Sequence, residues 1–145
     1  MSKANTWENG LLLLLFNNTT FAGVGDVTGM VGSSTPGSLY ISLHTGDPGE
    51  TGDQTTSEAT YTSYARVAVA RSGAGWTVTN NEVVPAAAIT FPTATGGTNT
   101  ITHFGIGTAS SGAGKLLYKG TVSPNIAVST SVTPVLNTST KVTED

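Results

Sequence analysis

The residues best suited to chemistry lie in one stretch, LYISLHTGDPGETGDQ (residues 39–54). Asp47, Glu50 and Asp53 follow His44 at intervals of three residues. Carboxylates and an imidazole could bind a metal ion or transfer protons. However, the EF-hand ligand spacing is absent, and the Pro-Gly pair within the stretch is typical of a turn. We therefore expect a solvated acidic turn that ends a strand.

The two histidines, His44 and His103, each lie at or beside an expected strand. If those strands pair, the rings could meet near Asp47, which would suit a metal-assisted hydrolase. Zinc sites take three or four protein ligands, however, and no third ligand is marked here. We expect hydrogen-bonded structural histidines, with no catalytic residue, no cofactor and no metal ligand.

Two glycine-rich stretches resemble nucleotide-binding loops but fail in detail. In ASSGAGKLL, Ala109 stands where a phosphate-binding loop needs glycine, and Leu116 stands where it needs serine or threonine. In GVGDVTG the third glycine is one residue too late, and no βαβ unit follows. Neither stretch predicts a nucleotide site.

The composition excludes several classes of function. The 145 residues suit one domain, only 10% of them are charged, and the net charge is −3. Six scattered basic residues argue against binding to nucleic acid or to anionic membranes. The absence of cysteine excludes disulfides and thiolate zinc sites.

The elements that must position these residues are mostly strands. β-Branched threonine and glycine-rich turns favour β structure. The expected strands are Ser38–His44, Tyr64–Arg71, Gly75–Thr79, Ala86–Phe91, Ile101–Gly107, Lys115–Val122, Ile126–Thr133 and Thr138–Thr143. This pattern predicts a mainly β fold, an antiparallel β-sandwich or jelly roll, with a short N-terminal helix and an extended glycine-rich arm.

The N-terminal helix is expected from Trp7 to Phe16. Asn5 and Glu8 resemble a helix-start signal, and Asn17-Asn18 would end the helix. Its apolar run is far too short to span a bilayer. Five consecutive leucines leave no polar face, so the helix must be covered by its own domain or by a partner chain.

We expect residues 1–37, the helix and the glycine-rich arm, to form an assembly element, and residues 38–145 to form the β-sandwich domain. Arg66 could contribute to an interface or a stacking contact, or could simply be a charge that blocks extension of an edge strand. The predicted interface residues are Trp7, Leu11, Leu12, Leu13, Leu14, Leu15, Phe16 and Arg66.

Four segments together resemble a family of small tailed-phage virion proteins that are often labelled tail fibre proteins. They are LYISLHTGDPGETG, SYARVAVAR, ITFPTATGGTNTITHFGIGTASSGAGKLLYKGTV and the terminal VTED. The resemblance covers the chain from about Glu8 to Asp145. It implies a non-enzymatic structural component of the virion, made in the cytoplasm of the host bacterium, and carries no catalytic residues.

Two structural roles follow from that resemblance. The first is a capsid decoration or cement protein on the capsid exterior, which binds the major capsid protein and itself as a dimer or trimer. The alternative is a tail-fibre or baseplate component that contacts host glycan, with Trp76, Tyr61 and Tyr64 as candidate stacking residues. We take capsid decoration as the leading hypothesis.

Overall fold

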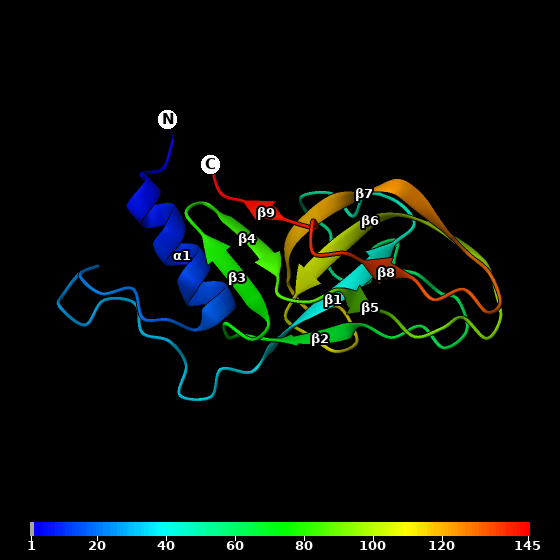
Figure 1. Ribbon diagram of the computed structural model, residues 1–145, viewed down its shortest axis with the longest axis horizontal. Helices are drawn as coiled ribbons and strands as arrows, with labels where there is room; N and C mark the ends of the chain where they lie inside the picture. The colour runs from blue at the N-terminus through cyan, green and yellow to red at the C-terminus, as the bar shows by residue number, and fades with distance from the viewer. Residues whose placement is uncertain (1) are drawn as a thin grey trace. The chain divides into compact units, whose positions relative to one another are not determined.

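A computed structural model describes residues 2–145 (Figure 1). The chain forms two compact units. The helical unit combines the described residues up to Ser38 with Val69–Ala88 and Asn137–Asp145. The sheet unit comprises Leu39–Ala68 and Ile89–Leu136. The predicted division at residue 37 stays a prediction, although the helical unit also includes two segments from later in the chain.

The helical unit is built on helix α1 (Asn5–Asn17) and a small antiparallel sheet. Strands β3 (Trp76–Thr79) and β4 (Glu82–Pro85) form a hairpin, and β9 (Val142–Thr143) pairs with β4. Helix α1 packs against this hairpin (Figure 1). The rings of Phe16 and Trp76 meet edge to face, with their centroids 4.8 Å apart. This contact anchors the C-terminal half of the helix.

The predicted end of α1 is confirmed, but its predicted start signal is wrong. Asn18 adopts the left-handed conformation (φ 56°), and its N–H donates to the Leu13 carbonyl, as a helix-ending residue does. At the other end the cap is Ala4, which has no side chain able to accept a hydrogen bond, and Asn5 is already helical. Packing of the apolar side chains therefore outweighs capping at this end of the helix.

Arg71 completes the C-terminal end of α1. Its Nε donates to the Leu15 carbonyl at 2.6 Å, and one Nη donates to the Leu14 carbonyl at 2.8 Å. The other Nη donates to the Pro36 carbonyl at 3.1 Å. These carbonyls in the last turn have no acceptor role within the helix, and a cation there also opposes the negative end of the helix dipole.

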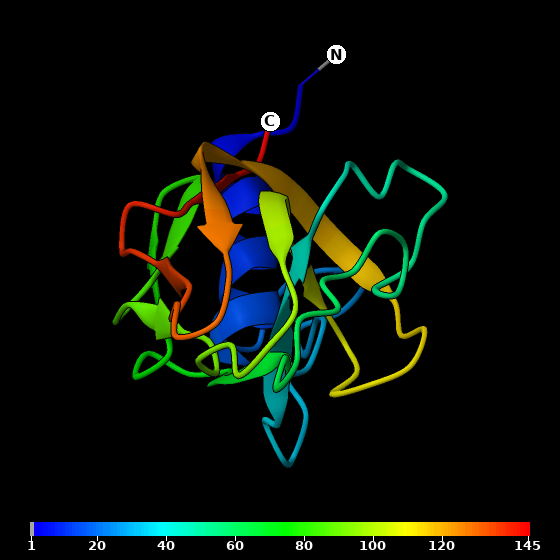
Figure 2. The same ribbon diagram turned by 90° about the vertical axis from the view of Figure 1, so that its right-hand side faces the viewer.

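The sheet unit contains most of one antiparallel sheet with the strand order β2-β1-β6-β7. These strands are β2 (Val67–Ala70), β1 (Ser38–His44), β6 (Asn99–Gly107) and β7 (Leu116–Val128). The short strands β5 (Ile89–Thr90) and β8 (Val135–Leu136) form a separate pair. Figure 2 looks onto this part of the chain.

Alternation along β1 and β6 gives the sheet two different faces. Ile41 lies opposite Ile106 and Leu43 opposite Phe104, and all four side chains are buried in an apolar core. The other face carries Ser42, His44, Gly105 and Gly107. Ser42 and His44 are completely buried too, so this polar face is also covered.

The predicted mainly β fold, with antiparallel sheets and a short N-terminal helix, is confirmed. Strand β1 has the predicted bounds. Two predicted strands, Lys115–Val122 and Ile126–Thr133, are instead joined in β7, with an irregular register against β6 between Ile101 and His103. Strand β4 was not predicted, because its charged first residue and closing proline obscure the alternation.

Within residues 2–145, no helix has both the length and the apolar character that crossing a membrane requires.

The geometry of Arg71 predicts that it supports the helical unit. Arg71→Met should lower the free energy of unfolding by about 2 kcal/mol, because carbonyls of α1 lose charge-assisted hydrogen bonds. Urea unfolding followed by circular dichroism measures this change. Arg71→Lys, which keeps the charge but not the three donors, should lie between wild type and Arg71→Met. Equal stability of Arg71→Met and wild type would contradict this role.

Candidate assembly surface

The glycine-rich segment after α1 folds back on itself. Phe21 and Met30 exchange two backbone hydrogen bonds of 2.9 Å, which closes a loop. Within the loop, Asp26 accepts the N–H groups of Thr28 and Gly29. We call residues 18–37 the strap, because this segment, predicted as an extended arm, is tied at several points along its length.

The side chain of Asn18 fixes the strap to the end of α1. Its Nδ2 donates to the Ser33 carbonyl, and its Oδ1 accepts the Ser33 N–H, both at 2.8 Å. Asn18 thus ends the helix with its backbone and holds the returning chain with its side chain. A β-branched residue could adopt neither this conformation nor these two bonds.

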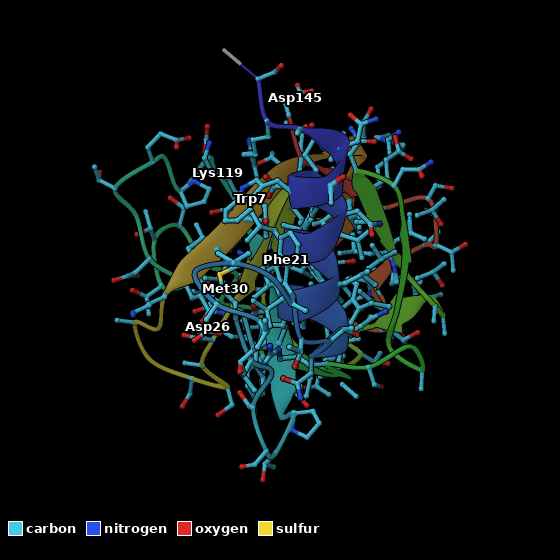
Figure 3. All side chains as sticks on the ribbon, turned by 90° about the vertical axis from the view of Figure 1, so that its left-hand side faces the viewer. Trp7, Phe21, Asp26, Met30, Lys119 and Asp145 are labelled. Atoms are coloured by element: carbon cyan, nitrogen blue, oxygen red, sulfur yellow. The ribbon has the colours of Figure 1, made fainter. Side chains whose placement is uncertain are left out.

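Phe21 attaches the strap to the helix at a glycine. A Cβ placed on Gly10 would lie only 2.4 Å from the Phe21 ring, so the ring occupies the space that any other residue would fill. The Trp7 ring lies beside it, with the centroids 5.5 Å apart. Figure 3 shows Trp7, Phe21 and Met30 on the same side of α1.

The predicted interface residues differ in exposure. Leu12 and Phe16 are fully buried, whereas Leu11, Leu13, Leu14 and Leu15 are half-buried. The helix is thus covered more on one side than on the other. Their predicted role in binding a partner chain stays a prediction.

Trp7 and the strap present apolar side chains to solvent. Trp7 is 37% exposed, Val31 is 62% exposed and Val27 is 91% exposed. We call these three residues the assembly surface. Apolar side chains gathered on one unit are typical of contacts with other proteins, whereas single exposed ones need no explanation.

In the sheet unit, the acidic stretch after β1 is a turn, as predicted. Asp47 Oδ1 accepts the Gly49 N–H at 2.8 Å, and Lys119 lies between Asp47 and Glu50. The Gly49 hydrogen bond, together with Lys119, lowers the pKa of Asp47. Throughout residues 2–145, no three His, Asp or Glu side chains are grouped so as to hold a metal ion.

The two histidines do face each other across β1 and β6, as expected if those strands paired. His44 is fully buried, with Nδ1 2.8 Å from the Thr56 carbonyl and Nε2 2.8 Å from Ser42 Oγ. A carbonyl only accepts, so Nδ1 carries the proton, and Nε2 accepts from the Ser42 hydroxyl. Burial lowers the pKa of His44, so its ring stays neutral.

Arg66 is engaged within the sheet unit. Its guanidinium is 2% exposed, contacts both carboxylate oxygens of Glu58 at 2.6 and 2.8 Å, and donates to the carbonyls of Ala109 and Gly112. It therefore joins the loop after β1 to the loop between β6 and β7. The proposed tyrosine neighbour is present in part, since Tyr64 donates to the same Glu58 carboxylate.

Gln54 holds the same two loops together from within. Its side chain is fully buried, Nε2 donates to the Tyr40 carbonyl, and Oε1 accepts the Ala109 N–H. A Cβ on Gly107 would lie 2.1 Å from the Gln54 amide carbon, and one on Gly114 would lie 2.3 Å from Oε1. These loops are thus locked over the polar face of β1 and β6.

The candidate glycan-stacking residues are not available for stacking, which corrects that prediction. Trp76 and Tyr61 are each 2% exposed, and Tyr61 donates to the Pro92 carbonyl. The Tyr64 hydroxyl is likewise used, accepting the Leu43 N–H and donating to Glu58. All three rings belong to apolar cores, because large aromatic side chains in a chain this poor in aromatics are needed there.

Sequence reasoning missed Gln54, Arg71 and the pair of Gly10 and Phe21. No spacing rule identifies a contact between residues that lie far apart in the chain. The one available signal was a glycine inside a leucine-rich helix, which costs helix stability and so indicates a close approach by another group.

The Gly10 contact predicts a specific rescue. Gly10→Ala should lower the free energy of unfolding by about 1–3 kcal/mol, because the clash with Phe21 outweighs the gain in helix propensity. Adding Phe21→Ala should remove the clash, so the double variant should be less destabilised than the sum of the two single variants. Urea unfolding of the four proteins measures this coupling, and strict additivity would contradict the contact.

Buried, neutral His44 predicts a stability that depends on pH. Its folded-state pKa is lowered from 6.5, so below about pH 6.5 the unfolded chain takes up a proton that the folded chain does not. The free energy of unfolding should therefore fall as the pH drops below 6.5, by at most about 1.4 kcal/mol per pH unit from this group. Urea unfolding between pH 8 and pH 5 measures the slope.

His44→Gln is the matching control for that slope. The difference in unfolding free energy between wild type and variant should be constant above pH 6.5 and should shrink below it. A difference that stays constant through this range would show that His44 is not held neutral. Comparing the two proteins cancels the titration of every other group.

Comparison with known families places the chain. The profile of the family described as podophage GP4 fiber I protein gp80 matches residues 2–142. No curated protein matches the chain. The family match spans nearly the whole sequence and agrees with the resemblance drawn from its motifs. The chain therefore belongs to the podophage GP4 fiber I protein gp80 family and is a structural protein of the bacteriophage virion.

Proposed function

We propose that this protein is a non-enzymatic structural component of the tail-fibre apparatus. The single observation that carries this proposal is the family match over residues 2–142, whose description names a fibre protein. It favours the tail over the capsid exterior, which was the leading hypothesis from sequence. A capsid decoration protein would share the β-rich body, but no observation on this chain points specifically to the major capsid protein.

The proposed mechanism is adhesion between subunits without chemistry. Trp7, Val27 and Val31 supply apolar area that a neighbouring fibre subunit can bury. The strap that carries the two valines is held on α1 by Phe21 and Asn18, so little order has to be gained on binding. A prearranged surface binds more tightly than a flexible one of equal area.

The sheet unit suits a mechanical part. Its loops are closed by Arg66 and Gln54, and its buried serine and histidine hydrogen-bond within the chain. Ser42 is completely buried, so a substrate has no access to its hydroxyl. Side chains that elsewhere take part in hydrolysis here stabilise a loop.

This proposal predicts where the protein lies on the particle. Immunogold labelling of purified virions should place gold on the tail fibres and not on the head. Quantitative mass spectrometry should then give copy numbers in the tens, in contrast to the hundreds expected on a capsid lattice. Gold spread over the head would overturn the proposal and return capsid decoration to first place.

The same virions test the assembly surface. Phage complemented with Trp7→Gln combined with Val31→Thr should incorporate less of the protein than wild type, while the purified variant keeps its unfolding midpoint. Val135→Thr, which alters a 44% exposed valine of the sheet unit, is the matched control and should be incorporated normally. Equal incorporation of all three proteins would exclude this surface.

A further inference from the structure

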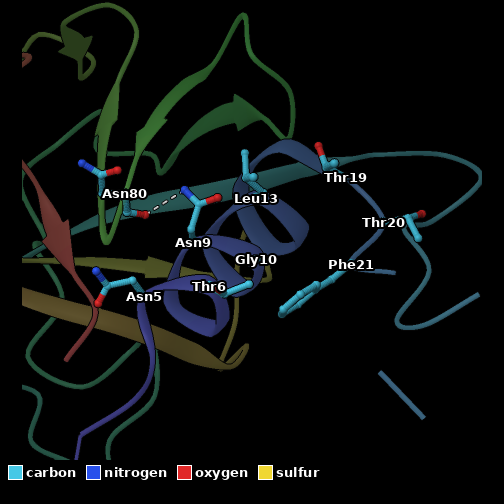
Figure 4. Close-up of a pocket in the computed structure, with 9 residues that line it drawn as sticks. All are labelled: Asn5, Thr6, Asn9, Gly10, Leu13, Thr19, Thr20, Phe21 and Asn80. Carbon is cyan, nitrogen blue, oxygen red and sulfur yellow. Dashed lines mark hydrogen bonds between the residues drawn. The ribbon is translucent and has the colours of Figure 1, made fainter. Parts of the chain in front are cut away.

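An open groove crosses the helical unit beside α1. Its volume is about 410 Å³, within the roughly 300–1,000 Å³ of small-molecule sites. It is formed by the first turns of the helix, the start of the strap and the turn between β3 and β4 (Figure 4). The lining residues are Asn5, Thr6, Asn9, Gly10, Leu13, Thr19, Thr20, Phe21 and Asn80.

The polar part of this lining is neutral. It consists of three asparagine carboxamides and three threonine hydroxyls, with no charged side chain. Among residues 2–145, the side chains of Asn5, Thr6, Thr19 and Asn80 have no hydrogen-bond partner, and the Asn9 carboxamide oxygen has none either. These groups offer both donors and acceptors to a ligand.

One hydrogen bond arranges this polar side in advance. Asn9 Nδ2 donates to the Asn80 carbonyl at 2.9 Å, which ties the helix to the β3–β4 turn (Figure 4). Asn80 is held in the left-handed conformation (φ 55°) by that turn. The Asn9 carboxamide oxygen therefore has a defined position without a ligand.

The rest of the lining is apolar. Gly10 and Leu13 lie on the helix, and the Phe21 ring lies at the edge of the groove nearest Thr6 (Figure 4). The contact with Gly10 and the neighbouring Trp7 ring hold the Phe21 side chain in place. An aromatic ring held in this way offers a rigid apolar surface beside fixed amides and hydroxyls.

We propose that this groove binds a neutral saccharide. Sugar hydroxyls both donate and accept hydrogen bonds, which matches carboxamides and threonine hydroxyls, and the C–H face of a pyranose ring can pack on Phe21 and Leu13. The uncharged lining provides no group to pair with a sialic acid or a phosphate. An uncharged extended peptide is the main rival, because its backbone amides also pair with asparagine.

This inference goes beyond the proposed function and does not depend on it. Saccharide binding is a property of the isolated helical unit's groove, whereas the fibre role concerns the position of the protein on the particle. Either can fail while the other stands, because the first is measured on purified protein and the second on virions.

The test is an NMR titration of the ¹⁵N-labelled full chain. The probes are the methyl glycosides of glucose, galactose, mannose and N-acetylglucosamine, with methyl sialoside and an acetylated, amidated alanine–serine peptide as comparisons. At least one neutral glycoside should shift the amide signals of Gly10, Thr20, Phe21 and Asn80 with a Kd on the order of 1 mM. The sialoside and the peptide should shift none of them.

Two variants tie the binding to the groove. Asn80→Gly keeps the left-handed turn but removes a carboxamide, and Thr6→Val removes a hydroxyl without changing the side-chain shape. Each should weaken binding by about five- to tenfold. Thr100→Val, an exposed threonine of β6, is the matched control and should bind like wild type.

Three results would overturn the proposal: no shift with any neutral glycoside, shifts that lie outside the groove, or shifts with the peptide alone. Both groove variants should keep the wild-type spectrum away from their own positions. That condition separates loss of binding from loss of folding. If one variant fails it, the other carries the test.

Discussion

Close packing against glycines is the constraint on which this structure depends. In several places a side chain occupies the volume that a Cβ would need, and each contact joins segments far apart in the sequence. The pairs are Phe21 on Gly10, Gln54 on Gly107 and Gly114, His44 on Gly105, and Phe104 on Gly120. Because interiors are packed without spare volume, each of these glycines selects one particular partner. The strap, the locked loops and the sheet core all rest on such contacts.

The scarcity of charge explains the second feature of the structure, which is that polar side chains bind backbone. Both arginines of the chain donate to carbonyls: Arg71 at the end of α1, and Arg66 in the loop between β6 and β7. Gln54 and Asn18 do the same work without charge. Long glycine-rich loops expose many backbone groups, and a buried group left unpaired is costly. A few multidentate side chains satisfy several of these groups at once.

These two features together give a rigid body with surfaces on the helical unit left for other molecules. The strap carries exposed valines, and the groove beside it carries polar groups without partners in the described chain. Both surfaces are positioned by the same Phe21 contact with Gly10. A virion protein needs this combination, since it must keep its shape while contacting neighbours or ligands. The residues that resembled a catalytic centre serve instead to close a loop over the sheet.

The sequence by itself determined the class of fold, the end of α1 at the asparagine pair, strand β1 and the turn after it, because each follows from local conformational preference or from alternation along a few residues. It also determined the family, through motifs spread along the chain. Only the tertiary structure decided that Arg66 binds Glu58, that Trp76, Tyr61 and Tyr64 are buried, and that residues 18–37 fold back onto the helix. Those outcomes depend on which distant segments meet, and local sequence does not encode the space that a missing Cβ leaves open for a remote side chain.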